Sequence, residues 1–508
     1  MIPLHSHGDC RLMHSAAFLF LLLSAAMLGC GGGSTQTIPA PTPAPVPQPL
    51  AGLTRLSSDT FTNASSQHAT EVEPGASSAG PSIVAAFQVG RIFNGGGADI
   101  GFATSTDSGA TWTSGFLPGI TVFQAGAFTA VSDSAVAFDP AHNVWLIASL
   151  AIGVESQIVV SRSSDALHWD NPVIISPVLN SDKPWIACDT RAISPYFGSC
   201  YAEWDDPDTS GGLIWMATSR DGGQTWSAPV NTADHAAGVG GEPVIQPDGT
   251  LVVPIENADG TALVAFRSND GGTSWSGTST ISGITDHLVA GNLRTSPLPT
   301  AATDASGTVY VAWQDCRFRL GCVSNDIVLA TSGDGITWSS PSRIPLDPLT
   351  SAADHFIPAL AVDPTTSGTT AHLALTYYEY GSANCTQTTC ALSTAITTSD
   401  DGGSTWSSPK TLAGPMSLTW LPDTFAGLMV GDYAASVYSG GTAFGIVAVA
   451  QANSGAEFDE AIFATSSGVS HEQGAARLLS EGEYPVPNAV SDHTPHRFYD
   501  VEPERPKP

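Results

Sequence analysis

The sequence predicts an all-β fold built from repeated four-stranded antiparallel units, and three observations support this. A short turn sequence, seen at residues 219–226 (SRDGGQTW), recurs along the chain. Only 13% of the 508 residues are charged, while glycine (51) and proline (36) are frequent, which is typical of many short strands joined by turns. The segments before each turn alternate apolar and polar residues with the period of a strand. The repeats favour one large repeat domain over several independent domains.

The repeated turn has a clear physical logic. In each copy an Asp caps backbone N–H groups, a Gly takes the positive-φ position, and a Trp anchors the turn on apolar side chains. Six copies occur, at residues 105–112, 163–169, 219–226, 268–275, 332–338 and 399–406. We therefore predict that four of the acidic residues are turn caps and not ligands or catalysts: Asp107, Asp221, Asp270 and Asp401.

These turns resemble the Asp box, also called the BNR repeat, of the sialidase-like β-propellers, and the resemblance covers most of residues 52–468. It implies blades of four antiparallel strands. It also implies that each box lies between the third and fourth strands of a blade, on the face opposite the binding site.

Alternation and turn residues predict three strands before each box. The first unit runs from Thr70 through strands 82–88 and 98–104, and the expected strands of the others are 134–139, 144–150 and 157–161; 183–189, 199–204 and 213–218; 243–246, 251–255 and 262–267; 298–303, 309–314 and 326–330; 357–363, 371–377 and 392–397. Three more strands, 433–438, 444–450 and 461–465, follow the last box and lack a fourth. Pairing them with residues 53–56 would remove an open edge. We therefore predict a seven-bladed β-propeller whose last blade is closed by the N-terminal strand; the alternative is six blades with a C-terminal appendage.

The two ends of the chain differ from this domain. Residues 1–29 contain an apolar run too short to span a membrane, and they read as an export signal. The ending Met27-Leu28-Gly29-Cys30 resembles a bacterial lipoprotein signal, which implies that Cys30 is lipidated and anchors the protein to the outer membrane or cell surface. Residues 30–51 read as a Gly/Pro-rich linker, residues 52–468 as the propeller, and residues 469–508 as a disordered tail.

Charge and cysteines narrow the classes of function. The formal net charge of −30 disfavours nucleic acid and anionic lipid headgroups as partners and suits an exported protein, which we expect to be a monomer.

Export makes disulfides plausible for the six cysteines that follow Cys30. Six cysteines allow fifteen pairings. Proximity in sequence favours Cys188–Cys200, Cys316–Cys322 and Cys385–Cys390, while a zinc site is disfavoured because no paired CxxC motifs occur.

Candidate site residues come from the strand order of a propeller. The first strand of each blade starts at the mouth of the central channel, and the loop between the second and third strands opens on the same face. The first-strand positions carry Glu73, Asp133, Asp182, Lys183, Glu242, Arg294, His355 and Asp432. The loop positions carry Arg91, Asp205, Glu256, Asp315, Arg317, Tyr378, Glu379 and Gln451.

A glycoside hydrolase is the first interpretation of this mouth. Resemblance to sialidases implies an arginine trio for a substrate carboxylate, a Tyr nucleophile paired with a Glu, and an Asp acid. The matching residues are Arg91, Arg294 and Arg317, Tyr378 with Glu256, and Asp99; the Arg91 motif (GRIF) lacks the family's Pro, and Tyr378 lies on a second strand. A hydrolase with two carboxyl groups would instead use Asp182 and Glu242. We expect the substrate to contact Arg91, Lys183, Arg294, Arg317, His355 and Asp432.

Two other interpretations remain open. A surface module without catalysis would bind a glycan or glycoprotein through aromatic residues such as Trp185, Tyr378 and Tyr433. The mouth carboxylates could also hold Ca²⁺, although no EF-hand loop is present. We expect no other cofactor and assign no metal ligands.

Overall fold

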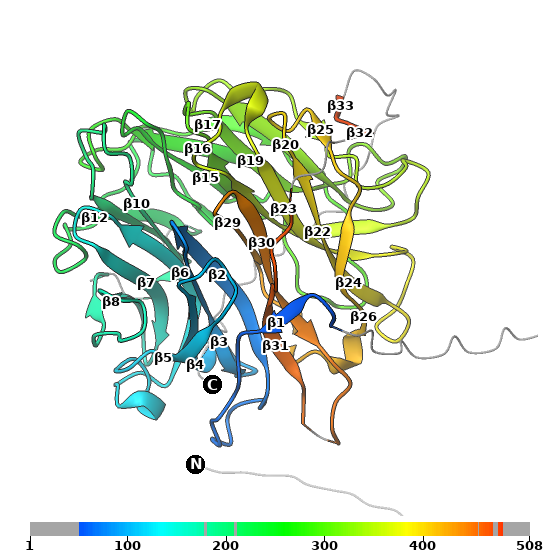
Figure 1. The fold of residues 1–508 in the computed structure, drawn as a ribbon, viewed down its shortest axis with the longest axis horizontal. Helices are drawn as coiled ribbons and strands as arrows, with labels where there is room; N and C mark the ends of the chain where they lie inside the picture. The colour runs from blue at the N-terminus through cyan, green and yellow to red at the C-terminus, as the bar shows by residue number, and fades with distance from the viewer. Residues whose placement is uncertain (1–49, 177–179, 208–210, 456, 471–475, 481–508) are drawn as a thin grey trace, which may run out of the picture. The chain divides into compact units, whose positions relative to one another are not determined.

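The computed structural model describes residues 50–176, 180–207, 211–455, 457–470 and 476–480 (Figure 1). The predicted export signal, Cys30, nearly all of the linker and most of the predicted tail lie outside these residues. The described residues form β-strands and three short 3-10 turns, η1 (Val122–Gln124), η2 (Gly368–Thr370) and η3 (Leu418–Trp420), and they contain no α-helix. The all-β prediction is thus confirmed for this part of the chain. No helix within it is long and apolar enough to cross a membrane.

The strands form antiparallel sheets in a β-propeller arrangement. One eight-stranded sheet contains β2 (Glu71–Ala79), β3 (Ser82–Arg91), β4 (Gly97–Ser105), β5 (Thr113–Phe116), β6 (Ala130–Asp139), β7 (Val144–Ile152), β8 (Ser156–Ser163) and β9 (Val173–Ile174). A three-stranded sheet contains β10 (Asp182–Cys188), β11 (Cys200–Asp206) and β12 (Leu213–Ser219). A five-stranded sheet contains β13 (Gly238–Val239), β14 (Val244–Ile245), β15 (Leu251–Asn257), β16 (Ala262–Ser268) and β17 (Ser279–Gly283).

The remaining sheets come from the second half of the chain. A second five-stranded sheet contains β18 (Thr300–Thr303), β19 (Val309–Asp315), β20 (Asp326–Ser332), β21 (Ser342–Arg343) and β33 (Leu479–Ser480). Two four-stranded sheets contain β22 (Asp354–Val362), β23 (Leu373–Tyr380), β24 (Ala391–Ser399) and β26 (Lys410–Ser417), and β1 (Leu53–Arg55), β29 (Ala435–Ser439), β30 (Thr442–Ala450) and β31 (Glu460–Thr465). Two small pairs join β25 (Thr405–Trp406) to β32 (Ala476–Arg477) and β27 (Asp423–Thr424) to β28 (Gly427–Leu428).

The structure has neither the predicted seven separate blades nor the six of the alternative. Among the described residues, five sheets have four or more strands and a sixth has three. One cause is the ladder pair between Gly97 and Val131, which joins β4 to β6 and merges the first two predicted units into one eight-stranded sheet. Another cause is that the segment after β12 pairs with it only through isolated bridges, such as Met216 with Val230.

The closing of the last sheet by the N-terminal strand is confirmed. Strand β1 pairs antiparallel with β31, with Leu53 opposite Thr465 and Arg55 opposite Phe463. The order β1-β31-β30-β29 therefore combines residues from near the start of the described chain with residues near its end (Figure 1).

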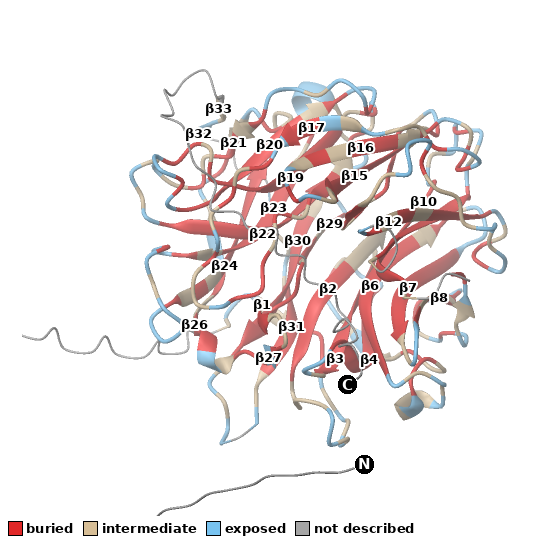
Figure 2. Ribbon diagram, turned by 180° about the vertical axis from the view of Figure 1, so that it is seen from behind, coloured by how far each residue is buried: buried red, intermediate tan, exposed pale blue. Residues whose placement is uncertain are grey.

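The core lies within and between the sheets. Strands β4 and β22 are buried along their whole length, and Figure 2 shows that burial is concentrated in the strands while the connecting loops are exposed. The innermost strands are neighbours: β2 contacts β6 and β29, β10 contacts β6, and β22 contacts β18 and β29. These contacts bring first-strand residues from distant parts of the sequence close to one another.

The Asp boxes have the predicted turn structure. The Asp221 carboxylate accepts hydrogen bonds from the Gln224 and Thr225 N–H groups at 3.0 and 2.9 Å and from the Thr225 hydroxyl at 2.6 Å. Gly223 has φ of 77°, and the indole of Trp226 donates to its carbonyl oxygen. The equivalent carboxylates of Asp107, Asp270 and Asp401 bond to their own turns in the same way. All four act as turn caps.

We expect Asp221→Ala to lower the free energy of unfolding by about 1–2 kcal/mol, the usual effect of losing a capping side chain. Urea denaturation would measure this loss, with Asp248→Ala as a control because Asp248 caps a turn with one bond, to the Thr250 N–H. Ligand binding or activity should not change, since the bonds that Asp221 accepts from Gln224 and Thr225 lie within its own turn. A loss of function without a loss of stability would contradict the structural role of the boxes.

The three predicted disulfides are present: Cys188–Cys200, Cys316–Cys322 and Cys385–Cys390. The first joins β10 to β11, and the other two close short loops. Three disulfides are typical of a protein exported to an oxidising compartment.

Candidate functional site

Backbone bulges on the innermost strands define the site. Glu73, Asp133, Lys183 and Ile357 all have positive φ, between 44° and 60°. Each lies where the pairing of a first strand with a second strand shifts register. Such a backbone is unfavourable for residues other than Gly, so its repetition indicates a conformation that the surrounding fold imposes.

Two of these bulged residues, Asp133 and Lys183, belong to a buried ion-pair cluster. Lys183 donates to a carboxylate oxygen of Asp133 at 3.2 Å and also to Asp432. Arg294 forms a two-pronged pair with Asp432, and its Nε donates at 2.7 Å. Lys183, Asp133, Arg294 and Asp432 are all at most 4% exposed. Asp432 is thus held between two cationic side chains.

Further hydrogen bonds extend this cluster to Tyr433, Glu73, Gln88 and Arg91. The Tyr433 hydroxyl donates to Asp133 at 2.6 Å, and the Asp432 N–H donates to Glu73 at 2.9 Å. The Gln88 amide donates to Glu73 and to the Ser132 hydroxyl, while its oxygen accepts from Arg91 at 2.7 Å. The hydrogen bonds therefore tie together β2, β3, β6, β10 and the segment before β29.

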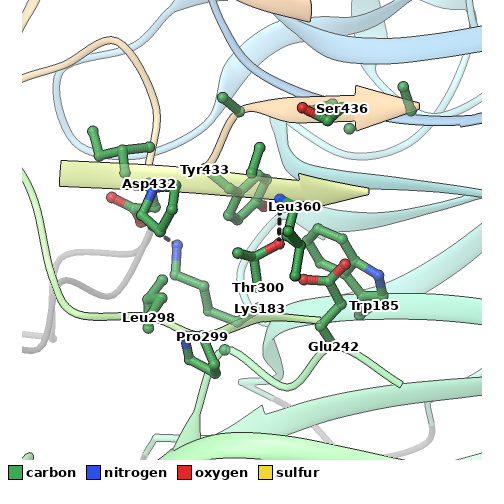
Figure 3. A pocket seen from close by; sticks show the side chains of 18 of the residues that line it. Lys183, Trp185, Glu242, Leu298, Pro299, Thr300, Leu360, Asp432, Tyr433 and Ser436 are labelled. Carbon is green, nitrogen blue, oxygen red and sulfur yellow. Dashed lines mark hydrogen bonds and ion pairs between the residues drawn. The ribbon is translucent and has the colours of Figure 1, made fainter. Parts of the chain in front are cut away.

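A pocket lies beside this cluster (Figure 3). The empty space between its lining atoms, open solvent at its mouth included, is about 720 Å³, and the part that the centre of a water molecule can occupy is about 60 Å³. Figure 3 shows Glu242 and Trp185 toward one side of the view and Asp432 toward the other, with Tyr433 and Thr300 between them. The charged residues that line it are Lys183, Glu242 and Asp432, and the larger apolar and aromatic ones are Trp185, Leu298, Ile357, Leu360 and Tyr433.

Glu242 has an unusual protonation equilibrium. Loss of hydration raises its pKa to about 8, against hydrogen bonds from the Ala301 N–H and Thr300 that lower it. The bond from Ala301 is 2.9 Å long. The side chain is half-buried, so it remains open to the pocket. Glu242 is therefore mainly a neutral carboxylic acid at pH 7.

The aromatic side chains Trp185 and Tyr433 form one wall. Their ring centroids lie 5.3 Å apart in an edge-to-face arrangement, and both rings are half-buried. The Lys183 ammonium lies 5.8 Å from the Tyr433 ring centroid. This wall is apolar on its face and carries a hydroxyl that is already bonded to Asp133.

The structure brings several of the predicted site residues together. Lys183, Glu242 and Asp432 line the pocket, and Arg294 lies behind Asp432. Asp182 begins β10 beside Lys183 and accepts a hydrogen bond from the Lys183 N–H at 2.9 Å; it stands opposite Asp205 on β11.

Other predicted residues do not line this pocket. The hydroxyl of Tyr378 is fully buried and bonds the backbone of Ala448, and its pKa is raised by burial. Arg317 pairs with Asp315 at 2.7 Å. Asp99 is fully buried on β4, where lost hydration raises its pKa to about 8, and Glu256 is buried on β15. The arginine trio is divided among three partners, because Arg91 binds Gln88, Arg294 binds Asp432 and Arg317 binds Asp315.

His355 belongs to a separate buried cluster. One ligand atom each from Asp326, Asp347 and His355 lie within 4.8 Å of one another, which is the geometry of a small metal site. Both aspartates, however, already pair with Arg319 and Arg343. Two guanidinium groups supply the positive charge that a metal ion would bring, so these residues fit an ion-pair cluster better than a Ca²⁺ site.

A proline that follows a site residue is a further sequence signal for this site. Glu73, Lys183 and Ile357 each precede a Pro on an innermost strand, and Glu242 precedes a Pro just before β14. Thr300 and Glu203 are not among the residues predicted from the sequence. A Cβ on Gly241 would lie 2.4 Å from the Glu203 carboxyl carbon, so Glu203 is packed directly against the residue before Glu242. Burial raises the pKa of Glu203 well above its usual value.

A comparison with protein families agrees with the sequence motifs. The BNR repeat-like domain family matches residues 201–358. A search of curated proteins finds no significant match. The chain is similar in structure to the Hadza microbial sialidase Hz136 (15% identity, TM-score 0.43, covering 77% of this chain and 75% of that one). It is also similar to a protein of unknown function from Dyadobacter fermentans (15% identity, TM-score 0.44, covering 68% of this chain and 99% of that one). A third similar structure is the α-L-arabinofuranosidase Arb93A from Fusarium graminearum (14% identity, TM-score 0.40, covering 70% of this chain and 94% of that one).

The family match spans two of the predicted full boxes, at residues 219–226 and 268–275, and the shortened box at residues 332–338. The resemblance seen in the boxes is thereby confirmed: residues 201–358 match the BNR repeat-like domain family.

Proposed function

We propose that the protein acts on glycans as a glycoside hydrolase whose site is the pocket beside the ion-pair cluster. The observation that carries this proposal is that one pocket presents two carboxyl groups in opposite environments. Glu242 is kept neutral by lost hydration, whereas Asp432 receives hydrogen bonds from Lys183 and Arg294. Two carboxyl groups with divergent environments are what acid catalysis of glycoside cleavage requires.

The two carboxyl groups take different roles. Glu242 holds a proton at neutral pH and donates it to the glycosidic oxygen as the bond to the leaving sugar breaks. Asp432 stays negatively charged and stabilises the positive charge that develops on the sugar ring. The Glu242 carboxylate then takes a proton from a water molecule whose oxygen bonds to the anomeric carbon, which completes the hydrolysis and restores the acid. Lys183 and Arg294 are positioning residues that hold the Asp432 carboxylate in place. Trp185 and Tyr433 offer an apolar wall against which a sugar ring can stack.

The test is a panel of fluorogenic glycosides, including a sialoside, assayed with wild-type protein and Glu242→Gln. We expect the substitution to lower kcat by about 10²–10⁴-fold, the usual contribution of a general acid. Asp432→Asn should lower it as well, and circular dichroism would show whether that variant still folds. Glu155→Gln is the matched control, because Glu155 is an exposed loop residue. Hydrolysis that is unchanged in Glu242→Gln would overturn this assignment.

A glycan-binding module without catalysis is the second candidate, and the half-buried Trp185–Tyr433 wall favours it. Stacking on an aromatic wall needs no acid or base. This function would be supported if no glycoside is cleaved but glycans still bind, and if Trp185→Ala abolishes that binding.

We also propose that the protein is exported and anchored through a lipid on Cys30, with residues 30–51 as the spacer before the propeller. The three disulfides support export, and the sequence before Cys30 supports the anchor. Incorporation of labelled palmitate into wild-type protein, and its loss in Cys30→Ala, would test the anchor.

A further inference from the structure

We propose that this pocket accepts the uncharged end of a glycan and rejects sugars that carry a carboxylate. The inference rests on the proposed action on glycans and adds the class of sugar. Three features support it: the partners of the cationic groups, the charge balance around the pocket and the chemistry of its walls.

Each cationic group at the pocket already has carboxylate partners. Among the described lining residues, Lys183 is the cationic one, and it bonds to both Asp133 and Asp432. Arg294 stands behind the wall with no exposed surface, and it is paired with Asp432 through two nitrogens. Recognition of a sugar carboxylate commonly uses the two-pronged donor geometry of an arginine. Here the Asp432 carboxylate of the protein itself occupies that geometry.

The cluster has no surplus of positive charge. Glu73, Asp133 and Asp432 supply three carboxylates, and Lys183, Arg294 and Arg91, which bonds to Gln88, supply three positive charges. These groups are buried, so the surrounding water screens them weakly. A carboxylate-bearing sugar entering the pocket would add a further negative charge beside Asp432. It would also have to displace an existing ion pair to gain a partner.

The walls suit a neutral sugar. Trp185, Tyr433, Leu298 and Leu360 present apolar surface, which matches the C–H face of a pyranose ring. The neutral acid Glu242 and the hydroxyl group of Ser296 can exchange hydrogen bonds with sugar hydroxyls, while the Thr300 hydroxyl is bonded to Glu242 and accepts from the Leu360 N–H. A site of this composition gains affinity by stacking and by neutral hydrogen bonds.

The test compares ligands that differ only in this charge. Methyl glucoside and methyl glucuronide share one ring and differ in having a hydroxymethyl or a carboxylate group at C6; galactoside with galacturonide makes a second pair, and a sialoside a further anionic probe. Calorimetric titration against Glu242→Gln at pH 7 measures binding without turnover. We expect each anionic sugar to bind at least about 100-fold more weakly than its neutral partner, the size of effect that like charges produce in a buried contact.

Equal or tighter binding of a uronide or sialoside would overturn the inference and leave the action on glycans standing. If none of these sugars binds, the proposed function fails, and the inference fails with it. The two failures are therefore distinguishable.

Two further measurements probe the cause of the selectivity. Asp133→Asn removes one partner of Lys183, so the penalty on the glucuronide should shrink by about 10-fold; Glu457→Gln, at an exposed position, should leave it unchanged. The second measurement varies the pH and does not need the Asp133→Asn variant to fold. In wild-type protein the penalty should widen between pH 7 and 9, because Glu242 becomes charged, and it should stay constant in Glu242→Gln. A penalty that responds to neither change would contradict an electrostatic origin.

Discussion

Replacement of Lys183 by Met is expected to lower the free energy of unfolding by about 3–5 kcal/mol, because it leaves buried carboxylates without their counter-charge. Lys183 is 4% exposed and bonds to both Asp133 and Asp432. In this variant Arg294 still neutralises Asp432. Asp133 loses its ion pair with Lys183 and keeps the hydrogen bond from the Tyr433 hydroxyl. Urea denaturation with tryptophan fluorescence would measure the loss.

Matched variants separate the lost charge from the lost side chain. Lys410→Met removes an exposed lysine and should change stability by less than about 0.5 kcal/mol. The double variant Lys183→Met with Asp133→Asn should recover part of the loss, since it removes one unpaired carboxylate as well. A loss below about 1 kcal/mol for Lys183→Met would mean that the buried ion pairs do not form as described.

The protein should be most stable in mild acid and lose stability as the pH rises from about 5 to 8. Lost hydration raises the pKa of three buried carboxyl groups and of the half-buried Glu242 above their ordinary values: Asp354 to about 6, Glu71 to about 7, and Glu242 and Asp99 to about 8. A group whose pKa is higher in the folded state stabilises the fold fully below its unfolded pKa. That contribution disappears as the pH rises through the folded value, at about 1.4 kcal/mol per group and pH unit.

The Asp boxes determine the pH below which the protein loses stability again. The hydroxyl and N–H of Thr111 lower the pKa of Asp107, and the N–H groups of Thr337 and Ile336 lower that of Asp334 to about 2. These groups stabilise the fold above their unfolded pKa, and their contribution is lost as the pH falls toward the folded value. The carboxyl groups with raised pKa and the Asp-box carboxylates with lowered pKa together place the maximum of stability near pH 4–5.

Calorimetric melting temperatures from pH 3 to 9 would measure this profile. Glu71→Gln should flatten the fall between pH 5 and 7, because an amide cannot ionise, and the exposed residue Glu155 provides the control Glu155→Gln. A melting temperature that rises between pH 5 and 8 would contradict the described burial of these carboxyl groups.

Local features of this protein could be predicted from the sequence. The turn caps of the Asp boxes depend on bonds within five residues, such as those of Asp221 to Thr225, and they are present as predicted. The disulfides join cysteines at most twelve residues apart. The pairing of β1 with β31 was predictable for a different reason, because three C-terminal strands lacked a fourth and one N-terminal strand was unassigned.

Features that depend on distant partners could not be predicted. The sheet count changed in part because of a single ladder pair between Gly97 and Val131, which no periodicity reveals. Lys183 and Asp432 are 249 residues apart, so their sequence positions indicate a shared face but not an ion pair. Tyr378 has the residue type of a nucleophile, yet its hydroxyl bonds the backbone of Ala448, 70 residues away. Side-chain burial and partners decide which candidate residues can reach a ligand.

The pairing of β1 with β31 also determines which sheet can form last during synthesis of the chain. Leu53 leaves the ribosome long before Thr465, its ladder partner, has been made. Throughout that interval the early strand has no sheet to join, and the other sheets can fold ahead of it. The final sheet is thus the last to be completed, and a ribosome that stalls before residue 460 releases a chain in which β1 has nothing to pair with.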